Sequence, residues 1–336
     1  LGDVYKRQIL QREVLPKLIA LFPKVQFIIT THSPLFLLGM EEQFGTEGFE
    51  IYEMPQGLKI NAERFSEFQK AYTYLTNTQQ YEQAIYDAVS NKQDKMLIVT
   101  EGTTDWKHMK AAYNKLSHMP EYAELFTGFE FEFLEYEPNN SSQNTKIKLE
   151  MGNGQLVSLC ENMAKIMQKR KMVFIADRDH NDTNKKLGGK DGKQFKKWGN
   201  NVYSFILPIP DFRTATPGIC IEHLYSDEVI KTEIETQNPN VKRRLYMGNE
   251  FDKRGYAPSL GVICEKKAVC GPEKINIIEG STGERVTLLD DENINVALSK
   301  MTFANLMLEG KTPFDEVDFK PFVPVSYTHL RAHETA

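Results

Sequence analysis

The sequence is poor in cysteine, and its cysteines follow no recognised spacing. The 336 residues include four cysteines, at positions 160, 220, 264 and 270. No two of them are separated by only two residues, which argues against a dense disulfide framework and against a CxxC-type zinc or redox site. We therefore expect a reduced protein of the cytoplasm.

Long apolar runs and an excess of positive charge are missing as well. No apolar run approaches the roughly 18 residues of a membrane helix, so we expect no membrane association. The formal net charge is −5, which does not suggest a nucleic-acid-binding protein, although uneven placement leaves a local basic surface open. The hydrophobic content of 40% and the charged content of 26% are those of an ordinary globular chain.

The two ends of the chain differ from the rest. Residues 1–8 (LGDVYKRQ) and 325–335 (VSYTHLRAHET) match the translation of a sequencing adapter on its two strands. We therefore exclude 1–8 and 325–336 from fold reasoning. We expect the natural segment to begin near residue 9, to end near residue 324, and to come from a longer gene.

Residues 9–62 combine a helical pattern, an apolar run and a turn. Apolar residues at helical spacing over 9–22 predict a helix, and the run 25–31 (VQFIITT) predicts a buried strand. A turn at 32–34 leads to a short apolar segment, and 49–53 with 57–61 predicts a hairpin. The polar segment 63–94, rich in Gln and Tyr, is interpreted as a connector between two domains.

From residue 95 onward, predicted strands and helices alternate. The predicted strands are 95–100, 129–135, 171–176 and 202–206, and the predicted helices are about 103–116 and 154–169. Such alternation predicts an α/β fold with a doubly wound parallel sheet over 95–210. Residues 211–324 form a less regular extension, with one clear helix at about 292–308.

Acidic residues follow two of the predicted strands. Glu101 and Asp105 follow the first, and Asp177 and Asp179 follow the strand 171–176. The carboxyl ends of parallel strands meet at one edge of a sheet, where such folds bind their ligands. Four neighbouring carboxylates repel one another unless cations lie between them, and Mg²⁺ or Mn²⁺ prefers such oxygens. The pattern predicts a metal site suited to phosphoryl transfer on nucleic acid. A purely structural role stays open, because acids are favoured at helix starts.

Residues 15–37 (LPKLIALFPKVQFIITTHSPLFL) resemble the last part of an ABC-type ATPase core, most closely that of the OLD (overcoming lysogenisation defect) family. The resemblance implies that 9–62 is the remnant of an ATPase domain and that His32 is its switch, reaching the γ-phosphate of ATP. The chain has no GxxxxGK[ST] phosphate loop, so we expect ATP to bind only in the full-length parent. An ordinary histidine that caps a turn is the alternative.

The order EGxxD, a Gly-containing turn and DxD resembles a TOPRIM domain over about 95–210. The matching positions are Glu101 with Asp105, the turn at 152–154, and Asp177 with Asp179. In OLD nucleases a later Glu and a Lys complete the site. Two further matches stand in the extension, which would then complete the nuclease site: Glu222 and Lys300.

The resemblance implies a metal-dependent DNA endonuclease coupled, in the parent, to an ABC-type ATPase. Two Mg²⁺ or Mn²⁺ ions would be held by Glu101, Asp105, Asp177, Asp179 and Glu222, while Lys300 would offset charge on the phosphate. The parent would bind DNA and form a homodimer or larger homo-oligomer. Two other classes stay open. One is a primase- or topoisomerase-type TOPRIM enzyme that performs nucleotidyl transfer, and the other is a non-catalytic, nucleotide-gated binding module.

A local cluster of lysines stands apart from the acidic residues. It lies in a predicted Gly-containing loop with Phe195 and Trp198, and its lysines include Lys190, Lys193, Lys196 and Lys197. Lysines bind the phosphate backbone and aromatic rings stack on bases, so the loop is a candidate DNA contact. A solvated loop is the alternative.

Overall fold

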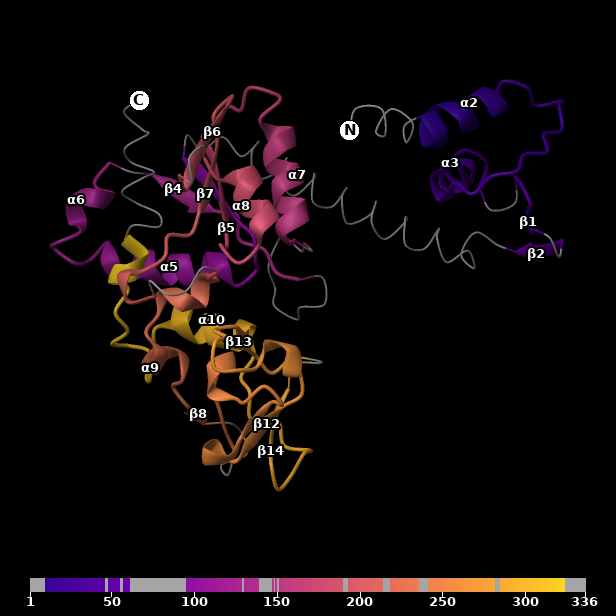
Figure 1. The fold of residues 1–336 in the computed structure, drawn as a ribbon. Coiled ribbons are helices and arrows are strands. Elements are labelled where there is room, and N and C mark those ends of the chain that lie inside the picture. Colours follow the sequence, from indigo (N-terminus) through magenta and orange to yellow (C-terminus); the bar gives the residue numbers. More distant parts are fainter. Residues whose placement is uncertain are drawn as a thin grey trace. The chain divides into compact units, whose positions relative to one another are not determined.

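The computed structural model describes residues 10–45, 48–54, 57–60, 95–128, 130–138, 147, 149, 151–189, 193–213, 218–235, 241–281 and 285–323. The chain divides into two compact units, Leu1–Tyr86 and Asp87–Ala336 (Figure 1). Both predicted adapter segments and the predicted connector 63–94 lie outside the described residues.

The described part of the first unit contains helices and one hairpin. A π-helical turn, η1 (Leu10–Val14), continues into α2 (Leu15–Ala20), within the predicted helix 9–22. After the turn at 32–34 the chain forms α3 (Pro34–Phe44). The strands β1 (Ile51–Glu53) and β2 (Leu58–Ile60) then pair antiparallel, as the hairpin prediction required.

Local chemistry determines where α3 begins and what it contacts. The Ser33 hydroxyl accepts the Phe36 backbone N–H at 3.2 Å, and Pro34 occupies the first helical position, both of which favour a helix start. A Cβ on Gly39 would lie 2.1 Å from the carbonyl oxygen of Arg12. The close contact between η1 and α3 therefore requires glycine at this position.

The predicted buried strand 25–31 is wrong. The segment forms no strand, and its apolar side chains face solvent, with Ile28 90% exposed and Ile29 48% exposed. A strand needs a neighbour to satisfy its backbone hydrogen bonds, and in the described part of this unit β1 and β2 pair only with each other.

The second unit is built on a mixed sheet of mostly parallel strands, as expected for an α/β fold. Its order is β4 (Phe131–Phe133), β3 (Met96–Thr100), β5 (Met172–Ala176), β7 (Val202–Ile206) and β6 (Phe195–Gly199). The first four strands run parallel, and they lie where the sequence predicted strands. Only β6 runs antiparallel, at one edge.

Three helices of this unit lie against the sheet: α5 (Asp105–Leu116), α7 (Asn153–Met163) and α8 (Asn181–Leu187). The short helix α6 (Ala123–Phe126) places the Phe126 ring 5.3 Å from the Tyr113 ring of α5, centroid to centroid. Ile98 packs in one core with Met109 of α5. Its chain neighbours Leu97 and Val99 are just as buried, and they point to the opposite face because side chains alternate along a strand. On that side α7 and α8 contact β5 and β7 (Figure 1). Both faces of the sheet are thus covered, and α7 ends earlier than the predicted helix 154–169.

The edge strand β6 corrects our expectation of a basic loop. Asn200 and Asn201 have φ angles of 53° and 64°, the left-handed values that a tight two-residue hairpin turn requires. The turn joins Trp198 and Gly199 to β7, so this lysine-rich segment becomes the antiparallel edge of the sheet.

The extension that follows β7 consists of short elements and one longer helix. That helix, α10 (Lys300–Glu309), packs against α5. It starts later than the predicted helix 292–308, because Asn295 and Ala297 form bridges with other segments and the Ser299 hydroxyl caps the helix by accepting the Thr302 N–H at 3.1 Å. The shorter elements are η4 (Asp211–Arg213), η5 (Ile221–Leu224), α9 (Asp227–Ile230), β8 (Ile234–Glu235), β9 (Lys242–Arg243), β10 (Tyr246–Met247), η6 (Gly248–Glu250), β11 (Tyr256–Ala257), η7 (Pro258–Leu260), β12 (Val262–Cys264), η8 (Lys267–Val269), β13 (Ile277–Ile278), β14 (Val286–Leu288) and η9 (Lys320–Phe322). Across the described ranges, no helix has the length and apolar character needed to cross a membrane.

Candidate functional site

Two of the predicted acids leave adjacent parallel strands at the same edge of the sheet. Thr100, the last residue of β3, is in register with Ile175 of β5. Glu101 therefore follows one strand where Asp177 follows the other. The Glu101 N–H donates to the Ile175 carbonyl at 3.1 Å, and the Asp177 N–H donates to the Glu101 carboxylate. The structure thus brings these two acids together.

Asp105 folds back onto the same strand end. It begins α5, and its Oδ2 accepts the Gly102 N–H at 2.6 Å. A Cβ on residue 102 would lie 2.8 Å from Asp105 Oδ1. Glycine at 102 is therefore what lets the carboxylate reach the backbone and lie near Glu101.

Asp179 lies at the exposed side of this group. Its charge raises the pKa of Glu101, so the two carboxylates are close. Gly218 packs beside it, and a Cβ there would lie 3.3 Å from the Asp179 Cα. Gly152 and Gly154, from the turn that resembles TOPRIM domains, stand just before and within the first turn of α7.

Glu222 and Lys300 form an ion pair from distant parts of the extension. Lys300 Nζ lies 3.0 Å from Glu222 Oε2 and 3.6 Å from Cys220 Sγ. Burial alone would raise the pKa of Glu222, but the charge of Lys300 and the smaller effects of His108, Cys220 and the backbone together outweigh burial and lower that pKa to about 2. Glu222 is therefore a carboxylate throughout the neutral range.

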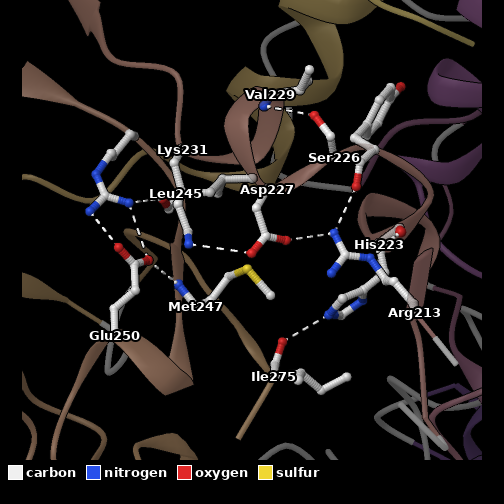
Figure 2. Close-up of polar contacts among 12 residues, drawn as sticks. Arg213, His223, Ser226, Asp227, Val229, Lys231, Leu245, Met247, Glu250 and Ile275 are labelled. Atoms are coloured by element: carbon white, nitrogen blue, oxygen red, sulfur yellow. Dashed lines mark hydrogen bonds and ion pairs between the residues drawn. The ribbon is translucent and has the colours of Figure 1, made fainter. Parts of the chain in front are cut away.

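A network of hydrogen bonds holds the turn η5 that carries Glu222 (Figure 2). The Arg213 guanidinium donates to the His223 carbonyl and, at 2.7 Å, to the Tyr225 carbonyl, and it pairs with Asp227 at 2.9 Å. His223 Nε2 lies 2.8 Å from the Ile275 carbonyl. These contacts hold the C-terminal end of the turn, and the Cys220 N–H, which donates to His223 Nδ1 at 3.1 Å, holds its start. The backbone at Glu222 therefore has little freedom.

The carboxylates shift one another's proton affinity. Burial, with Asp105 and Asp179 nearby, raises the pKa of Glu101 to about 8. Burial and the neighbouring Glu222 raise the pKa of Asp105 to about 6. Burial, Asp105 and Glu101 also raise the pKa of Asp177 well above its usual range. Negative charge is thus concentrated here beyond what Lys300 alone balances.

The site includes residues that sequence reasoning missed. His108 lies one turn beyond Asp105 on α5, and its Nδ1 is 2.9 Å from the Tyr225 hydroxyl. Burial lowers the pKa of His108 to about 4, so it is neutral at pH 7. Its place three residues after Asp105 puts it on the same helix face, which is the signal that could have identified it. Cys220 and Tyr225 had no such signal, because only the fold brings them here.

Two other sets of predicted residues lie elsewhere. His32 is an exposed residue of the first unit, and its ATPase role stays a prediction. Lys190 lies outside the described residues, whereas Lys193 and Lys197 are exposed. Lys196 Nζ donates to the Lys186 carbonyl at 2.7 Å and lies 3.4 Å from the centroid of the Trp198 ring.

The donor set suits a hard divalent cation, although its side chains do not yet converge on one point. In the part of the chain that the structure describes, no three His, Cys, Asp or Glu residues are arranged as a ready metal site. Two causes keep the side chains apart: carboxylates without a cation between them repel one another, and Lys300 lies beside Glu222. Two buried oxygens, Glu101 Oε2 and Glu222 Oε1, have no hydrogen-bond partner, as expected of atoms free to bind an ion. The residues fit such an ion in chemistry, with side-chain rotation needed to place them.

These acids could hold cations beside a phosphate group, and the half-buried Lys300 could balance added negative charge. Carboxylate oxygens select hard ions such as Mg²⁺ and Mn²⁺. Comparison with protein-family models, with curated proteins and with solved structures finds no match to this chain.

Proposed function

We propose that this chain carries the nuclease site of an OLD-type, metal-dependent DNA endonuclease, a hydrolase that cuts phosphodiester bonds. One observation supports this most. Acids from separate elements affect one another's pKa at the carboxyl edge of a mostly parallel sheet, with Lys300 among them. Natural structures seldom bury several like charges without a use for them.

In this proposal the acids bind Mg²⁺ or Mn²⁺ through oxygen atoms. The ligands are Glu101, Asp105, Asp177, Asp179 and Glu222. When bound, two such ions would activate a water molecule and stabilise the leaving oxygen. Glu101 Oε2 and Glu222 Oε1 have no hydrogen-bond partner in the described part of the chain, so they can bind an ion without the loss of a hydrogen bond. Lys300, now paired with Glu222 at 3.0 Å, would balance charge on the phosphate.

The first unit and the edge strand have separate proposed roles. In the full-length parent, His32 would act as the switch of an ABC-type ATPase to which ATP binds. The parent would work in the cytoplasm as a homodimer or larger homo-oligomer. Lys193 and Lys197, exposed beside and on β6, would contact the DNA backbone.

A topoisomerase-type reaction has less support. It needs a tyrosine nucleophile, and Tyr225 is the tyrosine that touches His108 of the site. Its side chain is buried, and burial raises its pKa, which is the opposite of what activation requires. An assay of plasmid nicking distinguishes the nuclease from a primase-type enzyme and from a non-catalytic binding module.

Nicking of supercoiled plasmid by the full chain, with Mn²⁺ and with EDTA, tests the proposal. We expect Mn²⁺-dependent nicking that Asp177→Ala abolishes, because a metal ligand is lost while the circular dichroism spectrum is kept. Asp182→Ala is the matched control, since Asp182 lies five residues away with its side chain 78% exposed. No nicking by the wild type, or equal nicking by both variants, would reject the proposed site.

A further inference from the structure

A second candidate site lies in the extension and shares no residue with the acidic site. It is a hollow of about 490 Å³ lined by Lys253, Arg254, Tyr256 and Lys267. The hollow is an open depression in the surface and not an enclosed cavity. We name it the basic hollow.

The backbone around the basic hollow is held in place. Asp252 Oδ1 accepts the N–H groups of Arg254 and Tyr256 at 2.8 and 2.9 Å. Gly255 has a φ of 84°, and a Cβ there would lie 2.6 Å from the Cys264 carbonyl oxygen. The turn therefore requires glycine, and it presents Lys253, Arg254 and Tyr256 on a fixed backbone.

The charge of the basic hollow opposes that of the whole chain. Three cations line it, whereas the chain carries a net charge of −5. Arg254 pairs with Asp252 at 3.1 Å. Lys253 and Lys267, within the described ranges, have no carboxylate partner. Lys274 flanks the same place, because its Cγ and that of Lys253 both lie within 4 Å of a Cβ built on Gly271. The surplus positive charge favours a polyanion.

Tyr256 adds a flat surface to these charges. Tyr256 is 39% exposed, and the Arg254 guanidinium lies 5.7 Å from the ring centroid. Lysines along a backbone with an aromatic ring between them are the features that bind single-stranded nucleic acid, since any base can stack on the ring. A duplex keeps its bases stacked inside, so it would use the charges but not the ring.

We propose that the basic hollow binds one nucleotide of single-stranded DNA, with the phosphate at Lys253 and Lys267 and the base on Tyr256. The choice of DNA rests on the proposed nuclease function, which this inference deepens by naming single-stranded DNA as the bound form. The hollow would hold a strand away from the bond that is cut.

Fluorescence anisotropy of a labelled oligothymidylate in EDTA, with the full chain, measures this binding without cleavage. We expect Lys253→Ala/Lys267→Ala to weaken binding about tenfold and to reduce the slope of log affinity against log salt by about 0.7, the value for one neutralised phosphate of a single strand. The matched control, Lys311→Ala/Lys320→Ala, removes the same charge from surface ion pairs and should bind as the wild type does. Tyr256→Ala should weaken binding about fivefold or more and Tyr256→Phe should not.

Equal affinity in the two double variants would overturn the proposal. So would an unchanged affinity in Tyr256→Ala, a preference for duplex of the same length, or the absence of DNA binding. The experiments can reject the proposed nuclease function independently of the proposed binding at the basic hollow. A wild type that binds the oligonucleotide but does not nick plasmid rejects the nuclease alone, and normal binding by the hollow variants of a nicking enzyme rejects the hollow alone.

Discussion

Glu101→Gln tests the electrostatics of the acidic site through stability, without any assay of catalysis. The fold raises the pKa of Glu101 from 4.5 to about 8, through burial first and then through Asp105 and Asp179. At pH 7 the native state holds a proton that the unfolded chain releases. The cost is 7.0 minus 4.5, or 2.5 pKa units, which is about 3 kcal/mol at about 1.4 kcal/mol per unit. Glu101 is only 9% exposed, so solvent screens this cost little.

The sign of the effect follows from the raised pKa. The contribution of Glu101 to the free energy of unfolding is fully present below pH 4.5 and is lost as the pH rises towards 8. Over this range the native state binds more protons than the unfolded chain. Glutamine has nearly the shape of the protonated acid and cannot ionise. Glu101→Gln should therefore be more stable than the wild type by about 2–3 kcal/mol at pH 7, with a difference that falls towards zero near pH 4.5.

Urea unfolding in EDTA at a series of pH values measures this difference. Glu130→Gln, at an exposed position next to β4, should show no comparable gain. Mn²⁺ should then reverse the order, because a ligand at about 1,000 times its Kd stabilises the native wild type by about 4.1 kcal/mol, whereas the variant has lost a ligand atom. A variant less stable than the wild type at pH 7 in EDTA would refute the account of repelling, buried acids.

Three further changes probe contacts of the fold. Lys300→Met should destabilise the protein by about 3 kcal/mol in urea unfolding, because Glu222 stays buried without its counter-charge; Lys300→Met/Glu222→Gln should recover most of the loss, and simple additivity would contradict the pairing. Gly102→Ala would place a Cβ 2.8 Å from Asp105 Oδ1 and should weaken Mn²⁺ binding in calorimetry. Gly154→Ala, whose Cβ would have nothing within 4 Å, should leave Mn²⁺ binding unchanged, and equal effects would show that the close approach at Gly102 is not needed. Ile28→Lys should change stability by less than about 0.5 kcal/mol and raise solubility, since Ile28 is 90% exposed. Leu38→Lys, at 4% exposure, should unfold the first unit, and a large loss of stability in Ile28→Lys would mean that the Ile28 side chain is covered.

The strands of the second unit could be predicted because they are buried on both faces. Residues 96–100, 172–176 and 202–206 are nearly continuous apolar runs, and all three strands are fully buried. Such runs identify inner parallel strands without knowledge of their neighbours. The acids that follow two of them could then be expected at one edge.

Turn chemistry was available in the sequence but was not used. The segment Gly199-Asn200-Asn201 between two β-rich runs marks a tight hairpin, and it would have predicted β6 instead of a loop. The start of α10 is similar, because Ser299 is a good N-cap and lies where the helix begins. The first miss is a whole strand, whereas the second is an element boundary, which local patterns specify weakly.

The strand predicted at 25–31 shows what apolar content alone does not determine. An apolar segment forms a buried strand when neighbouring strands lie beside it, because the hydrogen bonds of a strand come from other parts of the chain. Without neighbouring strands, the same segment stays exposed and unpaired.

By itself, the sequence determined the α/β character of the second unit and the order in which the acids Glu101, Asp105, Asp177 and Asp179 leave its strands. Only the tertiary structure decided that Glu222 and Lys300, 78 residues apart, meet at 3.0 Å, and that His108 and Tyr225 join them. The reason is range, since an apolar run and the acids that follow it are visible in consecutive residues. A charge pair across the fold depends on how α5, α10 and η5 pack.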